Sequence, residues 1–430
     1  MCLLLRWVFA LGCTVLLAIP AAAQNTGGLP GSEHELALEA FRAAERVVVH
    51  GDVVHYRFDL VVGPGQFDKI RIHRVVKEKV PYRPEKKMEG VLLLPAQLFE
   101  RIFLPAAAPG VEAQNGSLAL FLASHGVDVW GMDYGYSFVP YGTTDFSALE
   151  GWGVDKETRH VTSALSIARW LRAQSGQGAG PINILGFSYG GFLVYSAASE
   201  DTQRPGNLKN LKGLITVDGG AFKNNATAAA CASAAAAAAR LEAGAIVNQS
   251  GIMTIGLAAL DHPDEVSPQG LAALSPYFLA VPPYTFTNYQ WALASFVRSL
   301  FFAGTYAPDP PSVTTFFTEG PRIVELLANQ PPYGLIRIGY DSSASRCDSE
   351  LYPVAFDDHL AEVSVPILAV VRQTVPSLDV LERVASTDVS TLVLNPTMSP
   401  FLYGHADLML ANDAATVVWQ PILEWILAHR

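Results

Sequence analysis

Short apolar runs recur along the chain and alternate with segments of helical periodicity. The runs are typical of strands buried on both faces of a sheet. They lie at Gly90–Leu94, Val127–Met132, the run that begins at Pro181, Leu211–Val217, Val365–Val371 and Thr391–Leu394. The predicted helices are Ser117–Ser124, Lys156–Gln174, one that follows the Pro181 run and a terminal one from about Asn412. Strands alternating with helices predict an α/β protein with a mostly parallel sheet flanked by helices.

Before this series, two extended runs predict an antiparallel hairpin. Val53–Val62 and Lys69–Val76 are separated by Gly63-Pro64-Gly65, which is typical of a turn. The hairpin therefore precedes the parallel part of the sheet.

A long segment of different composition interrupts the strand series. Residues 221–358 are rich in alanine through Ala239 and then in proline and aromatic residues. We predict a largely helical cap at 221–358, inserted into a core made of residues 24–220 and 359–430. Its aromatic side chains would line an apolar pocket in part and pack the core of the cap in part. They are Tyr277, Phe278, Tyr284, Phe286, Trp291, Phe296, Phe301 and Phe302.

The first 23 residues predict a secretory signal peptide. One charge, Arg6, precedes an apolar stretch at Trp7–Ile19, and the small residues Ala21-Ala22-Ala23 favour cleavage before Gln24. The stretch is too short to span a bilayer, so no transmembrane span is expected in the mature chain. We therefore expect a secreted or periplasmic protein.

The composition of the chain limits the classes of molecule that we expect it to bind. The formal net charge is −11, and loss of Arg6 with the signal would make it −12, which argues against a nucleic-acid partner. Half of the residues are hydrophobic and 16% are charged, in keeping with a large core. Cys231 and Cys347 would be the two cysteines of the mature chain, and whether they pair is left open. No metal site or cofactor is predicted.

The clearest candidate for chemistry is Ser188, the centre of a G-x-S-x-G pattern that spans Gly186 to Gly190. A serine hydroxyl is a weak nucleophile and must be exposed where a general base can reach it. A sharp strand-to-helix turn flanked by glycine provides that exposure.

The hairpin, the G-x-S-x-G turn, the insertion and a histidine after the last predicted strand together resemble the α/β-hydrolase family. The resemblance covers most of the mature chain, and Gly116–Asp133 is especially similar to the lipase and esterase branches. It implies the α/β-hydrolase fold with a cap insertion. It identifies architecture more securely than substrate.

The resemblance also implies a catalytic triad. His405, in the loop after the last predicted strand, matches the family's general base. The acid is left between two candidates, since many relatives carry it after the strand equivalent to Val365–Val371, where this chain has no immediate carboxylate. Asp218 follows the preceding strand and is favoured over Asp379, which lies several residues beyond the usual position.

Backbone N–H groups of an oxyanion hole complete the implied site. The first donor would be Tyr189, directly after the nucleophile. The second would be Gln97, with Ala96 next, because Pro95 has no N–H group. We expect a secreted serine hydrolase of carboxylic esters with a small-molecule or lipid-like ester substrate. The alternatives are a serine peptidase or amidase of the same fold and a non-catalytic ligand-binding protein; the oligomeric state is left open.

Overall fold

The computed structural model describes residues 31–85, 88–96, 98–220, 228–268, 286–297, 317–347, 351–372, 376–395 and 402–430. The predicted signal peptide, Gln97 and five of the cap aromatics (Tyr277, Phe278, Tyr284, Phe301 and Phe302) lie outside these residues. None of the helices in the ranges just given combines the length and the apolarity needed to cross a membrane.

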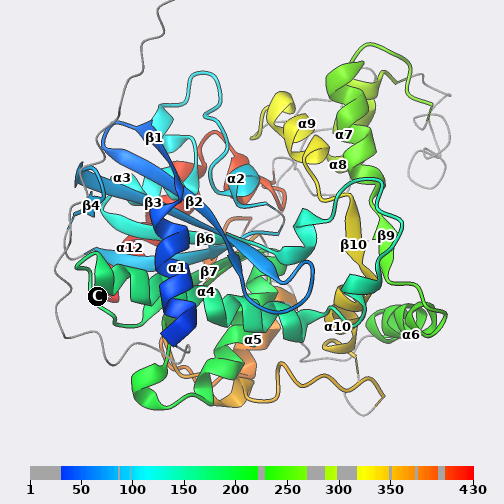
Figure 1. The fold of residues 1–430 in the computed structure, drawn as a ribbon. Helices are drawn as coiled ribbons and strands as arrows, with labels where there is room; N and C mark the ends of the chain where they lie inside the picture. The colour runs from blue at the N-terminus through cyan, green and yellow to red at the C-terminus, as the bar shows by residue number, and fades with distance from the viewer. Residues whose placement is uncertain are drawn as a thin grey trace, which may run out of the picture.

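A single large sheet organises the described chain, with the strand order β1-β2-β3-β6-β5-β7-β8-β11-β12 (Figure 1). The first three strands pair antiparallel and the last six pair parallel. β3 joins the two parts by pairing antiparallel with β6. The bounds are β1 Glu45–His50, β2 Val53–Val61, β3 Lys69–Val80, β5 Glu89–Leu94, β6 Val127–Asp133, β7 Ile182–Phe187, β8 Leu211–Val217, β11 Ile367–Val371 and β12 Val389–Val393, while the short β4 Arg83–Pro84 pairs with β3.

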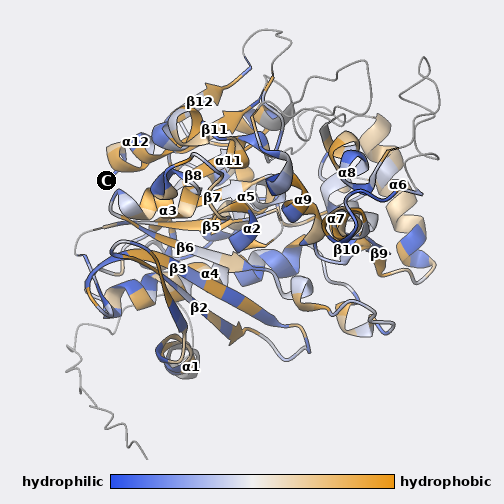
Figure 2. Ribbon diagram, turned by 90° about the horizontal axis from the view of Figure 1, so that it is seen from above, coloured by the Kyte–Doolittle hydropathy of each residue, from blue (hydrophilic) through white to orange (hydrophobic). Residues whose placement is uncertain are grey.

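Helices cover both faces of the sheet because successive side chains of a strand point to opposite faces. Val91 and Leu93 of β5 pack with one group of helices, and Leu92 and Leu94 with the other. The first group includes α3 Leu118–Ser124 and α12 Gln420–Ala428, and the second includes α1 Gly31–Arg42, α4 Val154–Gln174 and α5 Tyr189–Thr202. In Figure 2 the hydrophobic colour is concentrated in the central strands, whereas β2 and β3 alternate.

Between β8 and β11 the chain leaves the sheet and forms a separate group of elements at one side of it (Figure 1). They are α6 Ala228–Glu242, β9 Val247–Gln249, α7 Gly251–Asp261, α8 Asn288–Val297, α9 Gly320–Ala328, β10 Tyr333–Leu335 and α10 Ile336–Ala344. A disulfide joins Cys231 of α6 to Cys347 just beyond α10. Phe286 and Trp291 are buried and pack on each other, so these two predicted cap aromatics belong to an internal core.

The structure confirms the predicted α/β class and adds elements that the sequence pattern did not predict. These are α1, the edge strand β1 and the short α2 Phe99–Ile102. The terminal helix predicted from about Asn412 begins at Ala414 and contains a π-helical turn at Ala415–Trp419 that runs directly into α12. Pro421 lies near the start of α12, directly after the π-helical turn, where the backbone hydrogen-bond pattern departs from that of a regular α-helix.

Candidate active site

Ser188 occupies the sharp turn between β7 and α5. Its φ of 55° and ψ of −116° lie in a region that residues with side chains rarely adopt. The flanking glycines permit this turn. A Cβ atom on Gly186 would lie 2.1 Å from the carbonyl oxygen of Gly190, and one on Gly190 would lie 1.9 Å from that of Leu94. The G-x-S-x-G pattern is therefore a packing requirement of the turn.

Asp218 occupies a second strained turn, directly after β8, with a φ of 46°. Its side chain is only 4% exposed and binds two partners. His405 Nδ1–H donates to Asp218 Oδ2 at 2.6 Å, and Arg372 Nε–H donates to the same oxygen at 2.6 Å. Burial alone would raise the pKa of Asp218, but the hydrogen bond and charge of His405, with the guanidinium of Arg372, lower it below its ordinary value.

Contacts between the two turns bring Ser188 close to this pair. The Ser188 N–H donates to the carbonyl oxygen of Val217 at 2.9 Å, and a Cβ atom on Gly219 would lie 2.2 Å from the Ser188 carbonyl oxygen. The ring of Phe187, next to Ser188, stacks on His405 at 4.7 Å between centroids. The three predicted residues thus gather at the carboxyl ends of β7 and β8.

The loop that carries His405 is held by buried polar side chains. Asp407 accepts hydrogen bonds from Gly404 N–H at 2.7 Å and from the Thr318 hydroxyl at 2.6 Å. Asn395 exchanges two hydrogen bonds of 3.0 Å with the backbone of Tyr403. This support fixes the backbone on both sides of His405 and limits the positions that its ring adopts.

The predicted oxyanion donors differ in how far the structure describes them. Tyr189 is the first residue of α5, so its N–H group belongs to the positive end of a helix. Gln97 lies outside the described residues, but both of its flanks are fixed. The Tyr134 hydroxyl donates to the Pro95 carbonyl at 2.7 Å, and the Phe99 N–H donates to Asp133 Oδ1 at 2.6 Å.

Asp379, the alternative acid, lies in the short 3₁₀ helix Pro376–Glu382, and its side chain is half-buried. The hydrogen bond described above links His405 to Asp218 and not to this helix.

A cavity of about 570 Å³ lies away from this site, between residues 144–151 and the segment that joins α6 to β9. Its lining does not include Ser188, Asp218 or His405.

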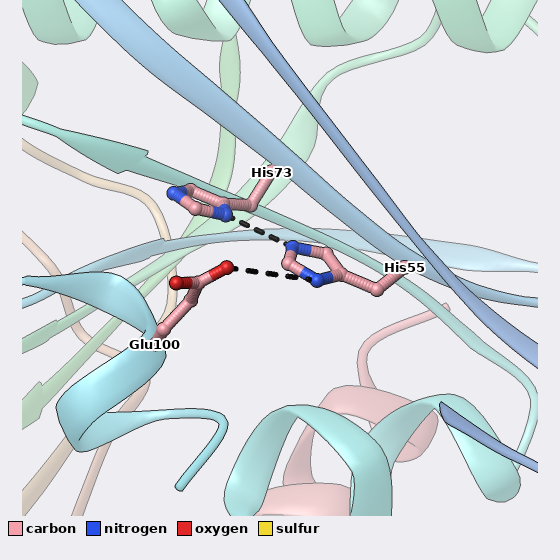
Figure 3. A group of neighbouring side chains, drawn as sticks. All are labelled: His55, His73 and Glu100. Atoms are coloured by element: carbon pink, nitrogen blue, oxygen red, sulfur yellow. Dashed lines mark hydrogen bonds and ion pairs between the residues drawn. The ribbon is translucent and has the colours of Figure 1, made fainter. Parts of the chain in front are cut away.

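One cluster of possible metal ligands escaped the sequence analysis. Donor atoms of His55 on β2, His73 on β3 and Glu100 on α2 lie within 4.8 Å of one another (Figure 3). They form a chain, since His55 Nε2 and His73 Nδ1 are hydrogen bonded to each other at 2.9 Å. Arg57 already binds both oxygens of Glu100, at 3.0 and 3.2 Å. A metal needs donors that converge on one point, so this arrangement is better described as a hydrogen-bond network.

Comparison with known proteins agrees with this architecture. No protein-family model matches the chain, and no curated protein matches it. Among solved structures, a provisionally assigned lipase from Sulfolobus solfataricus is similar over 90% of this chain and 99% of its own, with a TM-score of 0.60 at 20% identity. A soluble variant of monoglyceride lipase from Saccharomyces cerevisiae, in complex with a substrate analogue, covers 90% and 94% with a TM-score of 0.43 at 13% identity. The chain has the α/β-hydrolase fold, as the sequence predicted.

Proposed function

We propose that this protein is a serine hydrolase that cleaves carboxylic esters through an acyl-enzyme. The observation that carries the proposal is the hydrogen bond of 2.6 Å between His405 and Asp218, next to the strained turn of Ser188. Taken alone, each of Ser188, His405 and Asp218 has a structural explanation that needs no catalytic role. Together they supply a nucleophile, a base and a carboxylate that orients the base.

In the acylation step the Ser188 hydroxyl oxygen attacks the ester carbonyl carbon while His405 Nε2 takes the hydroxyl proton. Asp218 accepts the Nδ1–H of His405, which places the lone pair of the neutral ring on Nε2, the atom that acts as the base, and stabilises the imidazolium that forms. Collapse of the tetrahedral intermediate breaks the bond to the alcohol, and His405 returns the proton to the leaving oxygen. Water then repeats the sequence on the acyl-enzyme and releases the acid.

The negative charge on the carbonyl oxygen needs fixed donors during both steps. The Tyr189 N–H and a backbone N–H of the segment after β5, with Gln97 the favoured residue, take this role in the proposal. Donors of this kind act mainly in the transition state, so they raise kcat more than they lower KM.

The proposed substrate is an ester with a lipophilic acyl group or alcohol, in keeping with the lipase assignment of the Sulfolobus solfataricus structure. We also propose that the protein is exported to the periplasm or the medium. The apolar segment Trp7–Ile19 and the disulfide between Cys231 and Cys347 support export, because structural disulfides persist mainly in oxidising compartments.

The test is hydrolysis of p-nitrophenyl esters of increasing acyl length by the wild type and by Ser188→Ala. We expect Ser188→Ala to lower kcat by on the order of 10⁴-fold or more. Ser196→Ala is the matched control, because this buried serine lies on the same helix but bonds Thr158. It should keep wild-type kcat. A fluorophosphonate should label the wild type at Ser188. No turnover and no labelling in the wild type would contradict the proposal and favour a ligand-binding protein.

A further inference from the structure

Phe99 anchors the segment that follows β5. Its side chain is fully buried between His73, whose ring stacks on it at 4.4 Å and 15°, and Gly131 of β6. Gly131 leaves room for this ring, since a Cβ atom there would lie 2.1 Å from it. The Phe99 N–H donates to Asp133 at 2.6 Å. Both the backbone and the ring of Phe99 are therefore fixed.

The other end of the segment is fixed by the residue next to Asp133. The Tyr134 hydroxyl donates to the Pro95 carbonyl oxygen at 2.7 Å. Two consecutive residues at the end of β6 thus hold the backbone at Pro95 and at Phe99. The segment begins against the nucleophile turn, because Leu94 is paired with Gly186 and its carbonyl oxygen packs on Gly190.

Behind Asp133 lies the chain of two histidines shown in Figure 3. His73 Nε2 lies 3.1 Å from Asp133 Oδ2, so this nitrogen carries the proton that the carboxylate accepts. His73 Nδ1 then accepts from the Nε2–H of His55 at 2.9 Å. Burial is the main cause that lowers the pKa of His55 to about 3, so its ring is neutral and carries a single N–H proton.

The surroundings of His55 Nδ1 decide in which direction the hydrogen bonds of the two histidines run. His55 Nδ1 lies 3.9 Å from Glu100 Oε1, which is too long for a hydrogen bond, and Arg57 binds Glu100 instead. Both histidine protons therefore point toward Asp133. The Asp133 carboxylate accepts one of them at Oδ2 and the Phe99 N–H at Oδ1, which leaves it little freedom to rotate.

We propose that Asp133, oriented by His73 and His55, is a positioning residue that holds the backbone at Phe99, in the segment after β5, for stabilisation of the oxyanion. The inference rests on the proposed function, because this segment carries the second expected N–H donor. Asp133 does not touch the substrate; it acts through the backbone of Phe99. Shifts of about 1 Å in such a donor lower the rate by about a hundredfold.

The experiment compares Asp133→Ala, Asp133→Asn and the control Asp128→Asn. Asp128 is a buried aspartate at the opposite end of β6, bound to Arg74 and Arg172, so its loss affects stability without touching the segment. Active sites are counted by the extent of fluorophosphonate labelling, and kcat per labelled site is then measured. We expect Asp133→Ala to lower kcat by about tenfold to a hundredfold with KM unchanged. Asp128→Asn should keep wild-type kcat.

Asp133→Asn tests the direction of the hydrogen bonds. Its carbonyl oxygen can still accept from Phe99, while its amide would donate to His73 Nε2 and reverse both histidine tautomers. His55 Nδ1–H would then face Glu100, so we expect this variant to keep kcat within about threefold of the wild type. If Asp133→Ala does not fold, Asp133→Ser replaces it, because its shorter side chain also loses the bond to the Phe99 N–H group while keeping a polar atom at this position.

Hydrogen–deuterium exchange of the peptide that covers residues 95–103 separates this inference from the proposed function. Asp133→Ala should raise exchange there about tenfold, and Asp128→Asn should not. A wild type without esterase activity, combined with that rise, would overturn the proposed function and the catalytic part of this inference while the anchoring role stands. Unchanged kcat per labelled site in an active enzyme, in the Asp133 variant that removes the bond to Phe99, would overturn the positioning role.

Discussion

At the scale of single residues, the candidate site depends on two strained turns that hold each other. Ser188 and Asp218 both have positive φ values, of 55° and 46°. Each such conformation costs about 1–3 kcal/mol and persists only where its surroundings impose it. Here each turn restricts the other, since Ser188 donates to Val217 and Gly219 packs on the Ser188 carbonyl oxygen. The two turns place the half-buried Ser188 side chain at the end of β7 and bring the Asp218 carboxylate to His405.

The choice between Asp218 and Asp379 as the acid is testable at this scale. Asp218→Asn leaves the shape of the side chain intact, but its amide group can donate to His405 and favour the wrong tautomer. We expect kcat for ester hydrolysis to fall by about 10⁴-fold in Asp218→Asn. Asp379→Asn should retain wild-type kcat, and it is the matched control. Loss of turnover in Asp379→Asn alone would show that the acid is Asp379.

The sequence could predict Ser188, His405 and Asp218 because each follows a recognisable strand or motif. It could not predict the network of His55 and His73, which lie 18 positions apart on two strands. The register pairs His55 with Val75 and Arg57 with His73, so the two histidines are diagonal neighbours on one face. That register depends on the length of the turn between the strands, which the apolar pattern alone does not fix.

At the scale of elements, the strands that are buried on both faces are those whose bounds the sequence predicted best. The strands from β5 to β8 are buried on both faces and read as nearly continuous apolar runs, so their bounds agree with prediction to within one or two residues. β1 has no buried residue along its length, and its sequence shows little pattern. The helix α6 is a contrasting case: it consists mostly of alanine, and only Ala230 and Ala234 are buried.

Because α6 buries so few side chains, we expect its position to depend on the disulfide that attaches it. The disulfide between Cys231 and Cys347 links positions 116 residues apart and attaches α6 beyond the end of α10, on which it packs. We expect the double substitution Cys231→Ser with Cys347→Ser to lower the free energy of unfolding by about 2–4 kcal/mol, measured in urea. Dithiothreitol should destabilise the wild type by a similar amount and leave the double variant unchanged. Equal urea midpoints for wild type and double variant would show that the disulfide is dispensable.

At the scale of the whole molecule, the parallel strands collect the chemistry at one edge. Pro95, Asp133, Ser188 and Asp218 end or follow β5, β6, β7 and β8, and carboxyl ends of parallel strands share an edge. The alternation of strands and helices predicted this arrangement from sequence. The helices beneath the sheet carry buried polar groups that the pattern did not predict. One of them is Glu157 of α4, which is fully buried.

Glu157 makes the stability of the molecule depend on pH. Trp152 Nε1–H donates to its Oε1 at 2.6 Å, while Oε2 has no hydrogen-bond partner among the described residues. Burial outweighs the opposing effects of Trp152 and Lys156 and raises the pKa of Glu157 to about 8. In the unfolded chain the value is about 4.3. The folded state therefore binds more protons between these values, and stability declines as pH rises from about 4.3 to about 8.

The substitution Glu157→Gln removes this titration and keeps an acceptor for Trp152. We expect the wild type to lose stability between pH 5 and pH 8 and to level off above pH 8, whereas Glu157→Gln should lack that part of the decline. The free energy of unfolding of Glu157→Gln should therefore increase relative to that of the wild type as pH rises. Urea unfolding at several pH values measures both curves. Glu424→Gln, an exposed glutamate on α12, should follow the wild type. Parallel curves for wild type and Glu157→Gln would mean that Glu157 is already ionised in the folded protein near pH 5.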